Sequence, residues 1–451
     1  MNELSPLSTS LLKLRTAALF VVLVMLHLIV CRPVYASEAK TESNKTQAEE
    51  QYDPNRCFDR VWQIINDEFW DPNFNGVNWE DAKKRYKPKA LAATDHEAFA
   101  VIVNQMLAEL KTSHTYYYTK WNPDYYTLQA ALISGELREN NTTDTSVLEK
   151  RQPGLFSSQG DPHRTGIGVV TKQLNGRYYV TAVLASSPAE RAGIVLGDWI
   201  VEVNGRPFHP VRSFENEHGH ELEVTVQRSP SASGRHKLKV TPVDRKEREL
   251  FENDTLAHSK KLIKYKGHRF SYIRLWWLTG WKMRGAFEVG LMDYDTEGII
   301  IDIRDGFGGS PATEYIHPFL KGGLEIAQEY ISRNHTGRSS VPDNRQVVVL
   351  INGGSRSGKE LLAYYFKKTK RGLLVGERTA GYVSGGRQKR VSNESILYYC
   401  VGMMTIDGKH LEGVGVEPDI EVPFDIRFAA GRDIQLERAK DELVRLIEAK
   451  G

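Results

Sequence analysis

Continuous apolar runs recur in the second half of the chain and are separated by helical patterns. The three clearest runs are RFSYIRL, GIIIDIR and QVVVLIN (269–275, 298–304 and 346–352). Strands that are apolar on both faces are typical of a parallel sheet covered by helices, because both faces are then buried. The pattern predicts an α/β core over 264–425. Open sheets of this kind bind ligands at the carboxyl ends of their strands.

Other patterns divide the rest of the chain. Apolar residues recur at helical spacing in 58–70 and 96–110, which predicts a helical domain over 55–122. We expect its Trp62, Trp70 and Trp79 to lie in the core, with ligand stacking as the alternative. Turn-rich composition in 123–162 indicates a linker, and short β-rich runs predict a β domain over 163–245.

The two ends of the chain carry their own patterns. An amphipathic helix is expected in 426–451, with an apolar stripe of Leu436, Leu443, Leu446 and Ile447. We expect this stripe to pack on the core, with a partner site as the alternative. At the other end, basic residues precede an apolar run over 17–30, and small residues follow up to Ala36. This predicts a secretory signal peptide, 1–36, and a flexible tether, 37–54.

The signal peptide predicts export to the periplasm or the extracellular space. An uncleaved segment would instead anchor the protein to a membrane, and a lipoprotein at Cys31 is disfavoured because no small residues precede it. In an oxidising compartment Cys57 and Cys400 could form a disulfide, and two free buried thiols are the alternative. Whether the signal is cleaved is left open.

Composition excludes little. Hydrophobic residues make up 40% of the chain and charged residues 26%, as in ordinary globular proteins. The formal net charge is +3, which gives no electrostatic footprint for nucleic acid. No Cys/His cluster has metal-ligand spacing, so we expect neither a metal nor a cofactor.

Two serines follow the last of the apolar runs, where a helical pattern begins. They are Ser355 and Ser357 in INGGSRSGKE. A strand-to-helix turn exposes a hydroxyl, and the unpaired N–H groups of the helix start can hold developing negative charge. A serine at a helix start is more often simply an N-cap, and local physics does not separate the two serines.

A second glycine-rich strand exit lies in GIIIDIRDGFGGS. Gly308 and Gly309 would let backbone N–H groups approach a ligand without a Cβ in the way. In a parallel sheet the two exits can lie side by side, so one could supply a nucleophile and the other an oxyanion donor. We expect Asp302 and Arg304 to hold this loop by an ion pair.

A general base must come from elsewhere in the chain. Ser113 and His114 stand where the helical pattern of the first domain stops, and Glu412 lies in a glycine-rich turn near the C-terminus. A hydroxyl beside an imidazole orients it only when a further acceptor fixes that hydroxyl, and Glu412 is a candidate acceptor. Taken singly, each of these residues is more often structural or exposed.

Together these pieces resemble the C-terminal processing peptidases, or tail-specific proteases, of peptidase family S41. The resemblance covers roughly 55–425 and is strongest to the tricorn-core-like branch with a PDZ domain. The strings that carry it are TSHTY, GIGVV, SSPAERAGIVLGDWIVEVNGRPF, DIRDGFGG, SRSGKE, VGERTAG and EGVGVEPD. It implies a multidomain α/β fold: an N-terminal helical domain, an inserted β-rich PDZ domain, and an α/β protease core of the ClpP/crotonase-like type.

The resemblance also implies roles for the site residues. Ser357 would be the nucleophile and His114 the general base, while Ser113 orients the imidazole and Glu412 fixes Ser113. The backbone N–H groups of Gly309 and Gly358 would form the oxyanion hole. Ser355 would then serve as the helix N-cap. The implied activity is a serine endopeptidase that forms an acyl-enzyme and uses no cofactor.

The PDZ-like segment implies recognition of substrate tails. In a PDZ domain the loop matching Gly166, Ile167 and Gly168 holds the terminal carboxylate of a peptide that adds as a strand. Protein or peptide substrates with free, disordered C-termini are therefore expected, and nucleic acid is not. A PDZ domain that only supports the active site is the alternative. Whether it gates access, for which 211–220 is a candidate segment, is left open, as is the oligomeric state.

Two other functions remain open. Some family members use a Ser-Lys dyad, but here Tyr382 stands where their lysine is found; a displaced Lys359 or Lys367 would be needed. Tyrosine does not replace such a lysine at neutral pH without an unusual pKa shift. The second alternative is an inactive protein that uses the PDZ domain and the core to bind peptides or other ligands.

Overall fold

The computed structural model describes residues 51–140, 162–292, 295–309, 311–320 and 343–450. It also describes the backbone of two short strands that pair antiparallel, β13 (Tyr330–Ser332) and β14 (His335–Gly337). The predicted signal peptide and most of the predicted tether lie outside these residues, so both stay predictions. Within the described stretches of the chain, no helix is long and apolar enough to cross a membrane.

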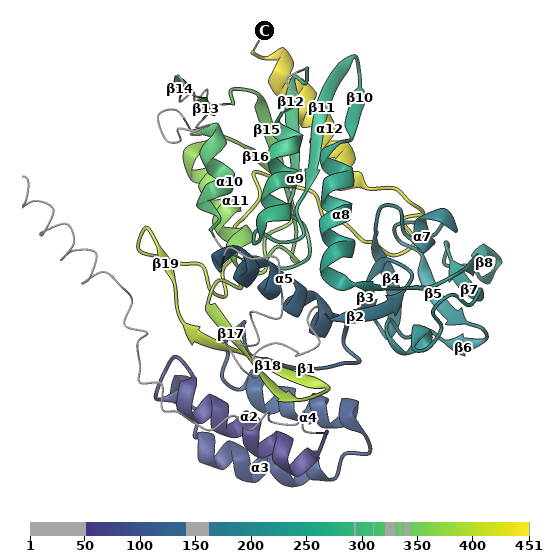
Figure 1. The fold of residues 1–451 in the computed structure, drawn as a ribbon, viewed down its shortest axis with the longest axis vertical. Coiled ribbons are helices and arrows are strands. Elements are labelled where there is room, and N and C mark those ends of the chain that lie inside the picture. The colour runs from purple at the N-terminus through teal and green to yellow at the C-terminus, as the bar shows by residue number, and fades with distance from the viewer. Residues whose placement is uncertain are drawn as a thin grey trace, which may run out of the picture. The chain divides into compact units, whose positions relative to one another are not determined.

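The predicted α/β core is present as a six-stranded sheet (Figure 1). All neighbouring strands run parallel except the first pair, which is antiparallel. Their spatial order is β10 (Leu262–Tyr265), β11 (His268–Arg274), β12 (Gly298–Asp302), β15 (Gln346–Ile351), β16 (Leu373–Gly376) and β21 (Ile420–Glu421). The three apolar runs of the sequence are β11, β12 and β15, side by side.

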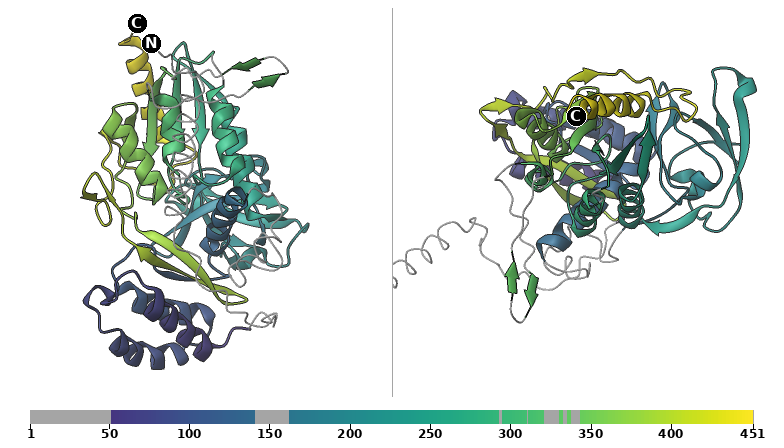
Figure 2. Two further views of the ribbon diagram at one scale, coloured as in Figure 1. Left: turned by 60° about the vertical axis from the view of Figure 1, so that its left-hand side comes forward. Right: turned by 90° about the horizontal axis from the view of Figure 1, so that it is seen from above.

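Helices cover both faces of this sheet, which explains why its strands are apolar throughout. Ile299 and Ile301 face one cluster and Ile300 faces the other, as the alternation of a strand requires. Seen from above in Figure 2, the C-terminal helix (yellow) lies across the sheet from the teal and green helices. The first cluster holds α9 (Trp281–Leu291), α10 (Thr313–Ile316), η4 (His317–Phe319) and α11 (Gly358–Thr369), and the second holds α12 (Ile434–Glu448).

The C-terminal helix packs as expected. Leu443 is fully buried against the sheet, and Leu436, Leu446 and Ile447 are partly buried around it. The predicted packing on the core is therefore confirmed, in preference to a partner site.

The N-terminal helical domain packs on a second, three-stranded sheet. Tyr117 and Leu397 face the helices, while Tyr118 and Ile396 face α5 and the core. The strands are, in order, β1 (Tyr116–Thr119), β18 (Ser395–Gly402) and β17 (Gly385–Ser392), and the helices are α2 (Pro54–Glu68), η1 (Phe74–Gly76), α3 (Trp79–Leu91) and α4 (His96–Ala108). A small hairpin, β19 (Thr405–Ile406) and β20 (Lys409–His410), follows this sheet.

The three tryptophans of this domain differ. Trp62 and Trp79 are buried, and each indole N–H donates to the other residue's carbonyl oxygen, at 3.1 and 3.2 Å. The prediction of a core position is wrong for Trp70, which is 37% exposed beyond the end of α2.

The prediction of a linker in 123–162 is wrong over its first half. Residues Pro123–Glu139 form the helix α5, capped by the Asn122 side chain, which accepts the N–H of Asp124 at 2.8 Å. Buried residues occur on most sides of this helix, including Thr127, Gln129 and Ser134. Because the helix is enclosed, it has no single apolar stripe, and the spacing of its apolar residues therefore did not predict a helix.

The predicted β domain is a twisted sheet with a short helix, α7 (Pro188–Arg191). Strands β2 (His163–Gly166) and β9 (Val243–Lys246) pair where the chain enters and leaves, as expected for an inserted domain, and the helix α8 (Glu247–Ser259) follows. The other elements are β3 (Val169–Leu174), β4 (Arg177–Val183), β5 (Trp199–Val203), β6 (Arg206–Pro207), η2 (Arg212–Phe214), β7 (Leu222–Gln227), η3 (Ala232–Gly234) and β8 (Arg235–Val240).

The two cysteines of the described residues are free thiols. Cys57 and Cys400 are both buried in the hydrophobic cluster between the helical domain and the three-stranded sheet. The alternative of two free buried thiols is therefore the one observed.

Candidate active site

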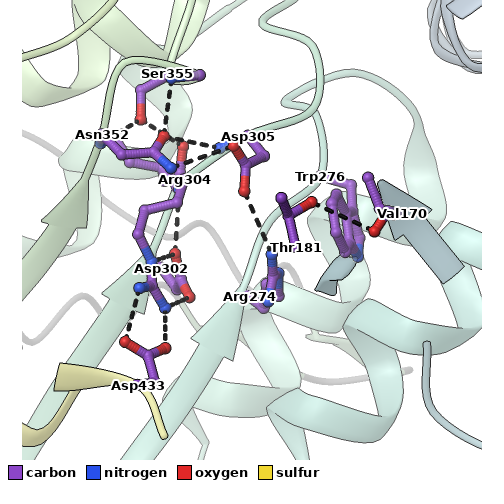
Figure 3. Close-up of polar contacts among 12 residues, drawn as sticks. Val170, Thr181, Arg274, Trp276, Asp302, Arg304, Asp305, Asn352, Ser355 and Asp433 are labelled. Atoms are coloured by element: carbon purple, nitrogen blue, oxygen red, sulfur yellow. Dashed lines mark hydrogen bonds and ion pairs between the residues drawn. The ribbon is translucent and has the colours of Figure 1, made fainter. Parts of the chain in front are cut away.

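The two serines after β15 have different environments. Ser355 is fully buried; its hydroxyl donates to the Ile303 carbonyl oxygen at 2.9 Å and accepts the Asn352 N–H at 3.1 Å (Figure 3). It therefore ties the exit of β15 to the exit of β12. The prediction that Ser355 is the N-cap is wrong, because Ser357 occupies that position before α11.

Ser357 has an unusual backbone conformation. Its φ and ψ are 58° and −127°, a sparsely populated region for a residue with a Cβ. Such strain persists only where surrounding contacts hold it. Here the Ser357 N–H donates to the Tyr382 carbonyl oxygen at 2.6 Å and to the Glu360 carboxylate at 3.1 Å.

Glu360 joins the start of α11 to the loop after β16. Its buried carboxylate accepts hydrogen bonds from the N–H groups of Gly381 and Tyr382, at 2.7 and 2.6 Å, and from the Thr379 hydroxyl. Burial raises its pKa, and these hydrogen bonds oppose that rise. Sequence reasoning missed Glu360, although the S-x-x-E spacing of Ser357 and Glu360 is the capping-box pattern that could have identified it.

The two glycine-rich strand exits meet, as predicted. A Cβ placed on Gly358 would lie 1.6 Å from the Gly309 carbonyl oxygen, and one on Gly308 would lie 2.4 Å from the Gly358 nitrogen. Gly309 also has a φ of +94°, which favours glycine. Within the described residues, neither the Gly309 nor the Gly358 N–H donates a hydrogen bond. The role of these two N–H groups as oxyanion donors stays a prediction.

His114 lies in a cluster of hydroxyls. Its Nδ1 is 2.8 Å from the Ser113 Oγ and 3.0 Å from the Ser384 Oγ, and the two hydroxyl oxygens are 3.1 Å apart. The imidazole is only 6% exposed. Burial lowers the pKa of His114 to about 4, while the negative charge of Glu412 opposes that shift. The ring is thus neutral at neutral pH, which is the form that accepts a proton.

Glu412 holds this cluster through the backbone. Its Oε1 accepts the Ser113 N–H at 2.9 Å, and its Oε2 accepts the N–H groups of Val383 and Ser384 at 2.8 and 3.0 Å. The structure thus brings Ser113, His114 and Glu412 together as expected. The expected contact from Glu412 to the Ser113 hydroxyl is replaced by one to the Ser113 amide, because the hydroxyl faces His114 and Ser384.

Ser384 is the site residue that sequence reasoning did not single out. Nothing in YVSGG distinguishes it from an ordinary loop serine. It reaches His114 only because β1 and β17 flank the same strand, β18, so that the residues preceding them meet at one end of the sheet.

One loop connects the nucleophile to the base. The Tyr382 carbonyl oxygen accepts the Ser357 N–H, and two residues later Ser384 contacts His114. Among the described residues, no hydrogen bond joins the Ser357 hydroxyl to His114 itself. The loop 379–384 therefore sets how the nucleophile and the base lie relative to each other.

The lysines weighed for a Ser-Lys dyad lie elsewhere. Lys359 is fully buried and donates to the Asp305 carbonyl oxygen, and burial lowers its pKa well below the usual range. Lys367 donates to the Glu417 carbonyl oxygen at 2.7 Å on the exposed side of α11. Tyr382 is 44% exposed, and its backbone carbonyl oxygen accepts the Ser357 N–H.

The predicted carboxylate-binding loop lies between β2 and β3. The carbonyl oxygens of Ile167 and Gly168 accept the N–H groups of Ala189 and Leu184, both at 2.9 Å. Their own N–H groups donate to nothing within the described stretches of the chain. Gly166 is the last residue of β2, and Ile167 and Gly168 connect it to β3. The role of these three residues in peptide binding stays a prediction.

Asp302 and Arg304 form the expected ion pair, at 2.7 Å. No group of three or more His, Cys, Asp or Glu residues within the described ranges could hold a metal ion.

Three family models match separate segments of this chain. They are peptidase family S41 over 269–422, the tricorn protease C1 domain over 51–108, and the PDZ domain over 179–228. The chain carries a peptidase family S41 domain. The first match falls on the α/β core, the second on the helical domain and the third on the inserted β domain, so the predicted family resemblance is confirmed.

The curated relatives that this chain matches are distant in sequence. The chain is 25% identical over 420 residues to the putative tricorn protease homolog 2 of Streptomyces coelicolor, covering 87% of this chain and 32% of the relative. It is 25% identical over 348 residues to a probable CtpA-like serine protease of Staphylococcus aureus, covering 71% of this chain and 64% of the relative. The chain thus spans less than two thirds of the length of either.

Two proteases are among the solved structures that match this chain at low identity. The tricorn protease matches with a TM-score of 0.47 and 20% identity, over 87% of this chain and 37% of that one. The photosystem II D1 C-terminal processing protease matches with a TM-score of 0.42 and 20% identity, over 85% of this chain and 99% of that one.

Proposed function

We propose that this protein is a serine endopeptidase in which Ser357 is the nucleophile and His114 the general base. The observation that carries the proposal is the environment of the base: a buried, neutral imidazole whose Nδ1 faces two hydroxyls, with Glu412 holding both hydroxyl-bearing residues. An imidazole fixed in this way directs its Nε2 outward for proton transfer.

The reaction follows from these positions. His114 takes the proton of the Ser357 hydroxyl as the oxygen attacks the scissile carbonyl carbon. The oxyanion forms between the N–H groups of Gly309 and Gly358. His114 then gives its proton to the leaving amine, and the acyl-enzyme remains on Ser357. A water molecule, deprotonated by His114, releases the acid product and restores the hydroxyl.

Both hydroxyls stabilise the imidazolium that forms during the reaction. Its Nδ1–H donates to the Ser113 and Ser384 oxygens, while the nearby Glu412 carboxylate favours the positive charge. This stabilisation offsets the weak basicity that burial gives His114. Ser384 thus joins the predicted residues as a positioning residue.

The substrates we propose are exported proteins with exposed or disordered C-terminal tails. The PDZ match supports recognition of a tail, as do the N–H groups of Ile167 and Gly168, which donate to no other described residue. The apolar N-terminal pattern supports export to the periplasm or extracellular space. A signal that is not cleaved would leave the enzyme anchored to a membrane.

The test is cleavage of a disordered reporter protein by wild type, Ser357→Ala and His114→Ala, each checked for folding by thermal melting. We expect both variants to lose about a thousand-fold or more in kcat/KM. The exposed hairpin serine variant Ser233→Ala is the control and should cut at the wild-type rate. A folded wild type that cleaves no substrate, yet binds peptides, would support the alternative of a binding protein.

A Ser-Lys enzyme is the second candidate, and the buried Lys359 with its lowered pKa favours it. A neutral lysine can act as a base, but the Nζ of Lys359 donates to the Asp305 carbonyl oxygen. Lys359→Met separates the two mechanisms. With His114 as base, Lys359→Met retains cleavage where His114→Ala does not; the reverse order would assign the base to Lys359.

A further inference from the structure

A cavity of about 1170 Å³ lies between the inserted β domain and the carboxyl ends of the core strands. Val170 and Thr171 of β3 line one end. The cavity is also lined by Arg356, which precedes Ser357 in the chain, and by Tyr382, whose carbonyl oxygen accepts the Ser357 N–H. A peptide in this cavity would therefore lie against both the β domain and Arg356, the residue that precedes Ser357.

Two arginines of this cavity lie at the ends of neighbouring strands and differ in their contacts: Arg274 is the last residue of β11, and Arg304 follows β12 by two residues (Figure 3). Arg304 donates to both carboxylates beside it, with contacts of 2.7 Å to Asp302 and Asp433, and to Gln435 at 3.1 Å. Arg274 pairs in register with Asp302, but its side chain donates no hydrogen bond to another described residue. Its nearest carboxylate oxygen, on Asp305, is 4.0 Å from Nη2.

Of the carboxylates near Arg274, Asp302 and Asp254 are hydrogen-bonded to other groups, and Asp305 forms only an ion pair with it, at 4.0 Å. Asp302 accepts from Arg304 and from the Tyr272 hydroxyl at 2.7 Å, and one Asp305 oxygen accepts from the Asn352 amide at 3.1 Å. A guanidinium has five N–H donors and is rarely enclosed without acceptors. Arg274 is only 12% exposed, and its Nε is enclosed without an acceptor.

Stacking fixes the guanidinium of Arg274 in place. It lies 4.2 Å above the ring of Trp276, whose indole N–H donates to the buried Asp254 at 2.6 Å. Because Nε is enclosed, only the terminal nitrogens can reach the cavity. A guanidinium held by a ring in this way loses little freedom when it forms two parallel bonds to one carboxylate.

A second stacked guanidinium connects this place to the nucleophile. Arg356, which directly precedes Ser357, lies 4.0 Å above the ring of Phe307. The Phe307 N–H in turn donates to the Trp276 carbonyl oxygen at 2.9 Å. The two aromatic residues are thus adjacent, and each carries one of the two stacked guanidinium groups.

We propose that Arg274 binds a carboxylate of the substrate within this cavity. The carboxylate belongs either to an Asp or Glu side chain or to the end of the chain being cut. This subsite rests on the proposed function, because it selects among the peptides that Ser357 would cleave. It requires no movement of Asp302 or Arg304, whose hydrogen bonds are complete.

The test separates binding from cleavage. Fluorescein-labelled peptides of glycine, serine and alanine are made in matched pairs. In the first set, the two peptides of a pair differ by Asp or Asn at one position, and each position is tested in turn. In the second set, they differ by a free or an amidated C-terminus. Binding to Ser357→Ala is measured by fluorescence anisotropy, and cleavage by wild type is measured as kcat/KM. In at least one pair, we expect the peptide with the carboxylate to bind about tenfold more tightly than its neutral partner, or tighter still.

Arg274→Gln in the Ser357→Ala background should remove that preference and leave binding of the neutral peptide unchanged. The control is Arg177→Gln, which removes a guanidinium stacked 4.3 Å above Trp199 but outside the cavity. Arg274→Lys keeps the charge without the fork and should restore some of the preference. Thermal melting verifies that each variant folds.

The outcome assigns the carboxylate. Loss of discrimination in an Asp/Asn pair identifies a side chain, and loss in the acid/amide pair identifies the chain end. If the Arg274→Gln variant prefers the peptides with a carboxylate as strongly as the Arg177→Gln variant does, the proposal is overturned. Because binding is measured without Ser357, a failure of the peptidase proposal would show separately, as absence of cleavage by wild type.

Discussion

Ser357 and His114 are held by two different kinds of structure. The nucleophile region consists of Ser357, Glu360 and the glycines 308, 309 and 358, and its backbone segments touch so closely that a Cβ at Gly358 does not fit. The base cluster consists of Ser113, His114, Ser384 and Glu412, and hydrogen-bonded side chains hold it together.

The difference shows which changes each of them can tolerate. Close backbone packing leaves the nucleophile region no alternative arrangement, so a single added methyl group must displace it. In the base cluster a pair of hydroxyls faces one nitrogen, so each hydroxyl can replace some of what the other supplies. We therefore expect sharp losses from single changes in the nucleophile region and non-additive losses in the base cluster.

Gly358→Ala should have the largest effect among substitutions that keep all side chains of the site. The new Cβ would lie 1.6 Å from the Gly309 carbonyl oxygen, so the two oxyanion donors must separate. Losing one such donor costs about 100- to 1000-fold in kcat, and we expect a loss at the upper end. Gly353→Ala is the control, since its nearest contact would be 4.0 Å away. Equal activity of both variants would contradict the close packing.

The double variant Ser113→Ala/Ser384→Ala should show the next largest loss of activity. We expect each single variant to lose less than about tenfold in kcat/KM, and the double variant to lose about a hundredfold, more than the product of the two. The paired serines Ser392 and Ser395, 2.6 Å apart at the far end of β17 and β18, supply the control double variant. If the losses simply multiply, the two hydroxyls act independently and the base cluster is not redundant.

Glu360→Gln should have a smaller effect. A Gln amide keeps one acceptor oxygen but turns a donor toward the N–H groups of Gly381 and Tyr382. We expect kcat to fall about tenfold through misplacement of Ser357, with a lower melting temperature and KM little changed. Glu437→Gln, at a surface ion pair with Arg432, is the control. A change confined to KM would show that Glu360 does not position the nucleophile.

The smallest expected effect is the change of kcat/KM with pH. A base must be neutral to act, and burial lowers the pKa of His114 from 6.5 to about 4, so neutral His114 persists as pH falls through 6.5. We expect kcat/KM to remain nearly level from about pH 7 to about pH 5 and to fall near pH 4. An acid limb at about pH 8 would point to a lysine base instead, and one near 6.5 to an exposed histidine.

The same contrast explains what the sequence could reveal. The strands β12 and β15, their glycine-rich exits and the start of α11 are contiguous patterns, so the nucleophile region could be predicted from local residue types. The choice of Ser357 over Ser355 could not, because it depends on the Ser355 hydroxyl reaching Ile303, 52 residues away.

The base cluster shows the limit more strongly. Ser113 and Glu412 are 299 residues apart. The residues alone offered Glu412 only as a candidate acceptor, and the resemblance to S41 peptidases assigned it the role. Ser384 belongs to no distinctive string, and its position depends on how three strands pair. The same holds for α5, whose enclosed surface hides its helical period. Contacts set by tertiary packing leave no local pattern to read.

The central claim is that the nucleophile region and the base cluster meet, so that His114 accepts the proton of Ser357. The most direct test is a chloromethyl ketone made on the peptide that wild type cleaves best. The serine hydroxyl adds to the ketone carbonyl, and the imidazole displaces chloride, so only a histidine beside the nucleophile is alkylated. We expect mass spectrometry to find one inhibitor bridging Ser357 and His114, absent in Ser357→Ala and His114→Ala. A stoichiometric adduct on any other residue, with His114 unmodified, would contradict the account.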